Sequence, residues 1–237
     1  MIAGTEAIVL QQIKYNDQSI IIRTYSRKFG MLSLLSSTTR RKGNRATRFL
    51  PLSIVEIVFY LKNNRGLQRL KEIHSSKPFR SIPFYAGKTA QAIFLAELIS
   101  KSIKEEEENA SLFSFLNDSI VFFDGCDGEM PDFHLKFMLD FTRHLGFWPI
   151  NNYSVETPFF SFKEGNFIQQ FNETCADAET SKAISQIIQI NYENLKQIGF
   201  SGKDRSVLIR KILEYYQWQL PAVKELKTPA VLEEVFG

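Results

Sequence analysis

The sequence predicts an α+β fold, with a small β-barrel in about the first 80 residues and a mainly helical region after it. Up to His74, β-branched runs alternate with turn residues, and beyond Pro83 the apolar residues recur with helical period. The charge changes at the same place. Residues 1–80 hold fifteen Lys and Arg against four acids, a net of +11, and residues 81–237 hold fourteen against twenty-two, a net of −8. The predicted domains are therefore 1–80 and 81–237.

Five short strands are expected in the first domain, separated by turn-forming residues such as Asn16-Asp17, Gly30 and Asn63-Asn64-Arg65-Gly66. Short strands at regular spacing predict a small closed barrel. A five-stranded barrel with a basic connection between its third and fourth strands fits an OB-fold, which commonly binds single-stranded nucleic acid through a charged groove and stacking aromatic rings. The expected strands are 6–13, 19–25, 31–35, 53–61 and 67–74.

The basic connection is the segment around which the chain is organised. It spans residues 37–49, has Gly43 and Asn44 at its middle, and contains no carboxylate. Cations crowded on one loop repel each other, and a bound polyanion relieves that repulsion. A charge run of this kind also fits a solvated turn with no ligand. The cations are Arg40, Arg41, Lys42, Arg45 and Arg48.

Four aromatic residues of the first domain could stack on nucleobases: Tyr25, Phe29, Phe49 and Tyr60. Each of them fits a core position at least as well.

Helical periodicity predicts a bundle with an inserted β-hairpin in the second domain. Pro131 is expected at the first position of the third helix and Gly146 at its C-cap. Between residues 151 and 171, Phe159–Phe162 and Asn166–Ile168 flank Lys163-Glu164-Gly165, which is typical of a hairpin. The expected helices are 84–104, 110–123, 132–145, 178–196 and 204–219.

Signatures of catalysis and metal binding are missing from the sequence. It contains no G-x-x-x-x-G-K-[ST], G-x-G-x-x-G, H-E-x-x-H or G-x-S-x-G motif, and its three histidines are dispersed. Cys126 and Cys175 belong to no C-x-x-C pair, so no zinc site is predicted from them. The acidic run Glu105–Glu108 fans around a helix end and fits a solvated surface better than a nuclease metal site. We expect a binding protein without a cofactor.

No apolar run of about eighteen residues and no signal peptide are found, which predicts a cytoplasmic protein without membrane association.

Taken in order, several segments resemble successive parts of one bacterial protein family. The opening, Ala7–Gly30, resembles that family's strand, polar turn, second strand, basic residues and Gly. The basic segment 40–48, Phe49–Leu52 and Gly66–Leu70 continue the likeness. Farther along, Phe141–Pro149 resembles the family's helix ending in Leu-Gly-Phe-x-Pro, and Ser206–Tyr216 resembles its last long helix. The family that these segments resemble is that of the bacterial recombination mediator RecO.

One departure from the family concerns zinc. Many members carry two C-x-x-C pairs that flank the hairpin after Gly-Phe-x-Pro, whereas here Pro149 is followed by Ile-Asn-Asn-Tyr-Ser and only Cys175 lies beyond the hairpin. We therefore expect a module at 151–171 without zinc, held by packing of its Phe residues.

The resemblance implies a non-enzymatic protein of recombination repair. Members of the family bind single- and double-stranded DNA, anneal complementary strands, bind the single-strand-binding protein, and with RecR help to load RecA onto coated gaps. A different reading is an OB-fold protein-interaction module whose basic loop binds an acidic partner in place of DNA. A nuclease is a third and weaker alternative.

Site residues follow from these expectations. Phosphate contacts are expected from the five cations of the basic segment and from a second set, Lys14, Arg23, Arg27 and Lys28. Arg23 fits fold packing or an internal ion pair equally well, because it lies in a strand. The tail of the single-strand-binding protein is short and acidic and ends in an apolar residue, so its receptor should be an apolar pocket rimmed with cations. Candidates for that rim, which also fit ordinary surface positions, are Arg143, Arg205, Arg210 and Lys211.

Overall fold

A computed structural model describes residues 1–37, 49–62, 66–221, 223, 226, 228, 229 and 232. The chain divides into two compact units. The first contains Met1–Phe84 and Ala92–Asp127, and the second contains Tyr85–Gln91 and Gly128–Gly237.

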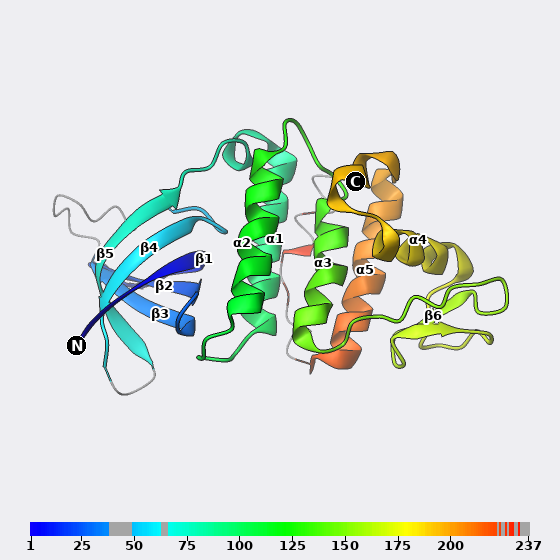
Figure 1. Cartoon of the computed structure of the whole chain (residues 1–237), viewed down its shortest axis with the longest axis horizontal. Coiled ribbons are helices and arrows are strands. Elements are labelled where there is room, and N and C mark those ends of the chain that lie inside the picture. Colours follow the sequence, from blue (N-terminus) through cyan, green and yellow to red (C-terminus); the bar gives the residue numbers. More distant parts are fainter. Residues whose placement is uncertain are drawn as a thin grey trace. The chain divides into compact units, whose positions relative to one another are not determined.

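The first unit is built on a closed five-stranded barrel with strand order β1-β2-β3-β5-β4 (Figure 1). Antiparallel ladders join β1 to β2 and to β4, β2 to β3, and β4 to β5, while β3 and β5 are parallel. This is the OB-fold that the sequence predicts. The strands are β1 (Ile2–Asn16), β2 (Ser19–Ser26), β3 (Gly30–Ser37), β4 (Ile54–Tyr60) and β5 (Leu67–Lys77).

Alternation of side chains fills the barrel with β-branched and aromatic residues. Opposite each other on β2 and β3, Ile22 and Leu34 are fully buried, and Val55 and Phe59 of β4 meet them in the same core. The neighbouring pair, Arg23 and Ser33, faces the other side of the sheet because successive residues alternate. The interior is therefore mainly apolar, and the outer face of β2–β3 carries Arg23 and Ser33 between two apolar pairs, Ile21 with Leu35 and Tyr25 with Met31.

Helices α1 (Ala86–Ser102) and α2 (Ala110–Gly125) follow the barrel. Residues 86–91 of α1 belong to the second unit and the rest of the helix to the first. Helix α2 begins at an Asn109 cap, whose side chain accepts from the Leu112 amide, and it packs on the barrel where Phe113 stacks on Tyr25 with ring centroids 6.3 Å apart.

The second unit contains α3 (Phe133–Leu145), α4 (Ala178–Gln189), α5 (Gly202–Gln219) and the hairpin β6 (Phe159–Ser161) and β7 (Asn166–Ile168). All three helices pack against one another. Phe133, Phe137 and Phe141 stand one turn apart on α3 and are buried together. In the hairpin, the Phe160 ring packs on Phe167 of β7 and on Tyr215 of α5.

Several helix ends differ from the sequence predictions by a few residues, and the two differences with a clear cause concern α3 and α4. Pro131 precedes α3 and does not occupy its first position, because Asp132 is the N-cap residue. Helix α4 ends at Gln189, seven residues short of the expected end, and a separate 3₁₀ helix, η3 (Tyr192–Gln197), follows it. Gly146 does close α3, in the left-handed conformation with φ of 87°.

Over the described part of the chain, no helix is both long enough and apolar enough to cross a membrane.

Candidate nucleic-acid interface and partner groove

The five cations of the basic segment, Arg40, Arg41, Lys42, Arg45 and Arg48, lie outside the described residues. The residues on either side of the segment are placed. Ser37 ends β3 opposite Ser19, next to the turn that joins β1 to β2. On the other side, the Phe49 carbonyl accepts from the Gln12 side chain of β1 at 3.0 Å. Both flanks of the basic segment are therefore held on the half of the barrel that ends in the β1–β2 turn.

The return of the chain into β4 is fixed on β1 by backbone hydrogen bonds. Leu52 donates to the Val9 carbonyl at 2.7 Å, and Val9 donates to the Ser53 carbonyl at 2.9 Å. Leu52 has a φ of 67°, which is rare for a residue with a branched side chain, and it is 1% exposed. Burial and these two bonds hold it there, so the chain re-enters the barrel after the basic segment at a fixed point.

Of the second set of cations, Lys14 lies on this side of the barrel and Arg23 lies on the outer face of the barrel. The Lys14 ammonium lies 2.8 Å from the Asp17 carboxylate, but both side chains are largely exposed, at 74% and 95%. A pair so exposed contributes little, so Lys14 can exchange Asp17 for a phosphate at small cost. Arg23 is half-buried on the outer face of β2, beside Ser33 of β3.

Arg27 and Lys28 lie at the opposite end of β2, in the turn to β3. The Arg27 guanidinium is 2.8 Å from the Glu6 carboxylate and lies over the Phe113 ring, 4.4 Å from its centre. Arg27 thus links β1 to α2, while Lys28 is exposed. Lys14 pairs with Ile20 and Ser26 pairs with Ala7, so the two ends are roughly 20 Å apart at 3.3 Å per residue. The four residues of the second set do not form one cluster.

The aromatic candidates for base stacking differ in how accessible their rings are. Tyr25 is 1% exposed against Phe113, and burial, with the Glu105 charge adding to it, raises the pKa of Tyr25 to about 12. Phe29 and Phe49 are partly buried against the barrel core. Tyr60, the last residue of β4, is 41% exposed. Tyr25 is therefore a packing residue in this structure, and Tyr60 has the accessible ring.

The four cations proposed for a partner-tail rim are not gathered around one pocket. Arg143 lies over the Trp148 ring, 4.2 Å from its centre, in the last turn of α3. Arg205 lies near the other end of α3, where its side chain is 14% exposed, 2.7 Å from Asp132 and 2.5 Å from the Phe200 carbonyl. Lys211 pairs with Glu214 at 2.9 Å, and Arg210 is exposed on α5.

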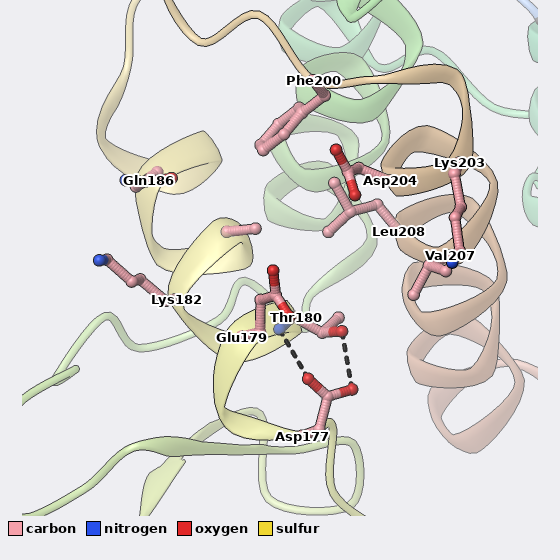
Figure 2. Close-up of a pocket in the computed structure, with 11 residues that line it drawn as sticks. Asp177, Glu179, Thr180, Lys182, Gln186, Phe200, Lys203, Asp204, Val207 and Leu208 are labelled. Carbon is pink, nitrogen blue, oxygen red and sulfur yellow. Dashed lines mark hydrogen bonds between the residues drawn. The ribbon is translucent and has the colours of Figure 1, made fainter.

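A groove that the sequence did not indicate lies between α4 and α5 (Figure 2). Its volume is about 630 Å³, within the range of sites that bind small ligands or peptide side chains. Phe200, Val207 and Leu208 supply apolar surface, and the Phe200 ring reaches over the space between the two helices. Lys182 of α4 and Lys203 of α5 are exposed at opposite margins.

Three carboxylates line the groove, and two of them, Asp177 and Asp204, are occupied by helix caps, whereas Glu179 is not a cap residue. The Asp177 side chain accepts from the Thr180 amide at 2.9 Å and from its hydroxyl at 2.8 Å. Burial works against ionisation of Asp177, but these bonds outweigh it and leave its pKa below the ordinary value. Asp204 forms a capping box with Ser201, and the hydrogen bonds from Ser201 lower the Asp204 pKa. The Lys203 charge contributes to this lowering of the Asp204 pKa, and in Figure 2 the Lys182 side chain extends away from α5.

Sequence periodicity places Lys182 on a helix, but the helix expected at 204–219 begins one residue after Lys203, and no pattern shows that the two helices are adjacent. The Ser201-x-x-Asp204 capping box was the one local signal for this end of α5.

Among the residues with described positions, no three His, Cys, Asp or Glu side chains gather as they would around a metal ion. Ser161 of the hairpin pairs with Cys175 in an isolated antiparallel β-bridge, and Cys175 is buried and forms no disulfide bond. The zinc-free hairpin remains a prediction, and metal analysis of the purified protein tests it.

Comparison with known proteins gives a consistent result over the whole chain. Residues 1–79 match the family model described as "Recombination protein O N terminal", and residues 86–228 match "Recombination protein O C terminal". Relatives named "DNA repair protein RecO" include one from Bacteroides fragilis, 34% identical with all of both chains covered, and one from Phocaeicola vulgatus, 33% identical with the same coverage. Another from Flavobacterium psychrophilum is 31% identical over 98% of both chains. The chain belongs to the RecO family of DNA repair proteins.

Proposed function

We propose that this protein is a non-enzymatic recombination mediator of the cytoplasm that binds the backbone of single- and double-stranded DNA through its OB-fold barrel. The observation that carries the proposal is the anchoring of the basic segment. Its two flanks are held near the β1–β2 turn, where Lys14 adds a cation, and Arg23 extends the charge onto the outer β2–β3 face. Loops and the β2–β3 face are the surfaces through which OB-folds bind oligonucleotides.

Phosphate binding of this kind would also promote annealing. Two complementary strands repel one another through their phosphates, and a group of cations that neutralises both lowers that repulsion. Because contacts to phosphate carry no sequence information, any complementary pair would be annealed. In the same proposal the protein acts with RecR to help load RecA onto gaps coated by single-strand-binding protein.

The proposed receptor for the acidic tail of single-strand-binding protein is the groove between α4 and α5. Phe200, Val207 and Leu208 offer an apolar seat for a terminal apolar side chain. Lys182 and Lys203 stand at the margins and can pair with tail carboxylates, while Asp177 and Asp204 are hydrogen-bonded in caps. Glu179 also lines the groove, so the tail carboxylates have to lie at the two lysines and away from this side chain. This replaces the four dispersed arginines and lysines as the site to test first.

Neutralising Arg40, Arg41 and Lys42 together to Gln tests the DNA proposal. We expect weaker binding of every oligonucleotide sequence, and a plot of log affinity against log salt flatter by about 2–3 units, measured by fluorescence anisotropy. The matched control neutralises Lys104, Lys163 and Lys196, three exposed cations outside the barrel. If the loop variant keeps the affinity and salt slope of the wild type, or if the wild type fails to bind at low salt, an acidic protein partner becomes the better explanation of the loop.

Reversing the two groove lysines, Lys182→Glu with Lys203→Glu, tests the tail proposal. We expect at least about tenfold weaker binding of a labelled tail peptide, because each contact then becomes repulsive, with DNA affinity unchanged. Lys196→Glu, an exposed change outside the groove, is the control. Unchanged peptide affinity in the double variant would remove the groove as the receptor.

A further inference from the structure

A second cavity, of about 290 Å³, lies at the edge of the barrel where the start of β3 meets the connection from β4 to β5. Phe29, Leu32 and Leu61 form apolar walls, and Lys62 and Glu106 supply charged groups. The two edges come together because β3 and β5 run parallel, with Ser33 opposite Leu67. In OB-folds this connection and the neighbouring β2–β3 face are surfaces that bind oligonucleotides.

Hydrogen bonds and packing fix the walls of this cavity. The Lys62 amide donates to the side-chain oxygen of Gln68, 2.9 Å away, which holds the start of the β4–β5 connection. The Phe29 ring meets Phe59 edge to face with centroids 5.4 Å apart. Residues held in this way are preorganised, so a ligand would not have to pay for ordering them.

The acidic segment that carries Glu106 is pinned to the barrel as well. Met31 donates its amide to the Glu105 carbonyl at 3.0 Å. Gly30 has a φ of 61°, and a Cβ at this position would come within 2.5 Å of the Glu105 carbonyl oxygen. Glycine is therefore required for so close an approach, and Glu106 is held at the cavity as a result.

The charges at the cavity decide which part of a DNA strand could enter it. Glu106 belongs to the run Glu105–Glu108, and four consecutive carboxyl groups repel phosphate. The apolar walls and the aromatic ring of Phe29 suit a flat, uncharged ring instead. A volume of about 290 Å³ is at the lower limit for small-molecule sites, which fits one ring system.

We propose that this cavity receives a single nucleobase of bound single-stranded DNA and prefers bases with an exocyclic amino group to thymine. An ionised carboxylate only accepts hydrogen bonds, so Glu106 can pair with the amino group of cytosine, adenine or guanine. On the same edge thymine offers only its ring N3–H as a donor, and the two carbonyl oxygens that flank this donor are repelled by the carboxylate. Lys62 can hold the adjoining phosphate. The inference rests on the proposed DNA-binding function and adds a base preference to it.

Affinities for oligo-dC and oligo-dT of equal length test the base preference. In the full-length wild type we expect oligo-dC to bind at least about fivefold more tightly, the lower end of what one good contact to a base edge gives. Glu106→Gln should bring the ratio close to one. Glu108→Gln removes an equal charge from an exposed residue that does not line the cavity, so it should change both affinities together and keep the ratio.

Methyl NMR of Leu32 and Leu61 locates the base directly. Oligo-dC should shift both signals, whereas an abasic oligonucleotide of the same length should bind without shifting them. If oligonucleotides bind with equal affinity for dC and dT, or without shifts at these methyl groups, the base cavity is overturned and DNA binding by the barrel stands. If no oligonucleotide binds, the proposed function fails and the base cavity fails with it.

Discussion

At the scale of single residues, Asp124 shows how a side chain can be placed against its local preference. A carboxylate in the last turn of α2 is unfavourable for the helix dipole. It is explained by three backbone amides after the barrel that donate to it, those of Arg80 at 2.7 Å and of Ser81 and Ile82 at 2.9 Å each. The Ser81 hydroxyl also donates to the Asp124 carbonyl at 2.6 Å. Asp124 thus ties the end of the barrel to α2.

Replacing Asp124 with Ala should destabilise the first unit by about 2–4 kcal/mol, because buried amides lose their acceptor. Hydrogen exchange of the barrel amides measures this loss within the unit concerned. Asp118→Ala on the same helix, at an exposed position, should cost less than about 0.5 kcal/mol. Equal exchange rates in the two variants would show that the Asp124 contacts do not stabilise the barrel.

Sequence patterns could not have predicted the role of Asp124, because its partners lie more than forty residues away. The same holds for Asp132, the N-cap residue of α3. Its side chain makes no cap hydrogen bond, and its carboxylate binds Arg205 instead. A long-range ion pair replaces the local cap. Next to it, the prediction that Pro131 occupies the first position of the helix is wrong.

At the scale of elements, strong local sequence signals predicted which helices and strands exist better than they predicted where each one begins and ends. All five strands occur where alternation and turn residues placed them, and each begins or ends within a few residues of the expected bounds. Helix α4 was expected to continue to Lys196 because Ile184, Ile187 and Leu195 keep the helical period. The helix ends at Gln189, and Leu195 is buried from the separate η3. The periodic spacing of apolar residues indicates which residues are buried, but two short helices can bury these residues as well as one long helix does.

The capping box of α5 gives a prediction at this scale. Ser201→Ala removes the hydroxyl that bonds to the Asp204 carboxylate at 2.7 Å and accepts from its amide at 3.2 Å. We expect a loss of about 1 kcal/mol in the free energy of unfolding of the second unit. Urea unfolding followed by tryptophan fluorescence reports on this unit, since Trp148 and Trp218 both belong to it. Ser201→Thr, which keeps the hydroxyl, should lose much less, and an equal loss would argue against the cap.

The hairpin supplies a second prediction. Gly165 has a φ of 67°, and a Cβ there would meet the Tyr215 hydroxyl at 2.8 Å. That hydroxyl donates to the Phe147 carbonyl, so Tyr215 cannot move away without losing a partly buried hydrogen bond. Gly165→Ala should therefore lower the free energy of unfolding by about 1–3 kcal/mol in the same tryptophan assay. Gly128→Ala is the control, because its φ is also positive but its Cβ would meet no atom. If Gly128→Ala costs as much, backbone strain alone explains the effect.

At the scale of the whole molecule, the charge difference between residues 1–80 and 81–237 predicted a polyanion-binding module attached to a helical region, and the chain belongs to a family of DNA repair proteins. What the sequence could not predict is which distant residues share a surface. Lys14 and Lys28 were placed in one set, yet the ladder puts them at opposite ends of the barrel. Lys182 and Lys203 share a groove because α4 and α5 pack together, which no local pattern records.

The pH dependence of unfolding tests the buried His134 side chain of the second unit. His134 is fully buried, its ring nitrogen Nδ1 is 3.1 Å from the Gln91 side-chain oxygen, and burial, with the Arg205 charge, lowers its pKa to about 3. Above pH 6.5 neither the folded nor the unfolded state carries the proton. Below pH 6.5 the unfolded chain binds a proton at His134 that the folded chain does not bind. The free energy of unfolding therefore falls by about 2 kcal/mol from pH 7 to pH 5.

His134→Gln should remove most of that loss, because the amide keeps a polar group at the site and does not titrate. Asp132 opposes the trend at lower pH, since burial raises its pKa despite the hydrogen bond and charge of Arg205, so that acidification relieves a cost in the folded state. The difference between wild type and variant should therefore be clearest between pH 7 and pH 5, by tryptophan-monitored urea unfolding. His74→Gln, at an exposed residue of the first unit, should leave the pH dependence of this signal as it is. An unchanged pH dependence in His134→Gln would mean that other groups take up the proton, and the neutral buried histidine would no longer explain the acid sensitivity of the unit.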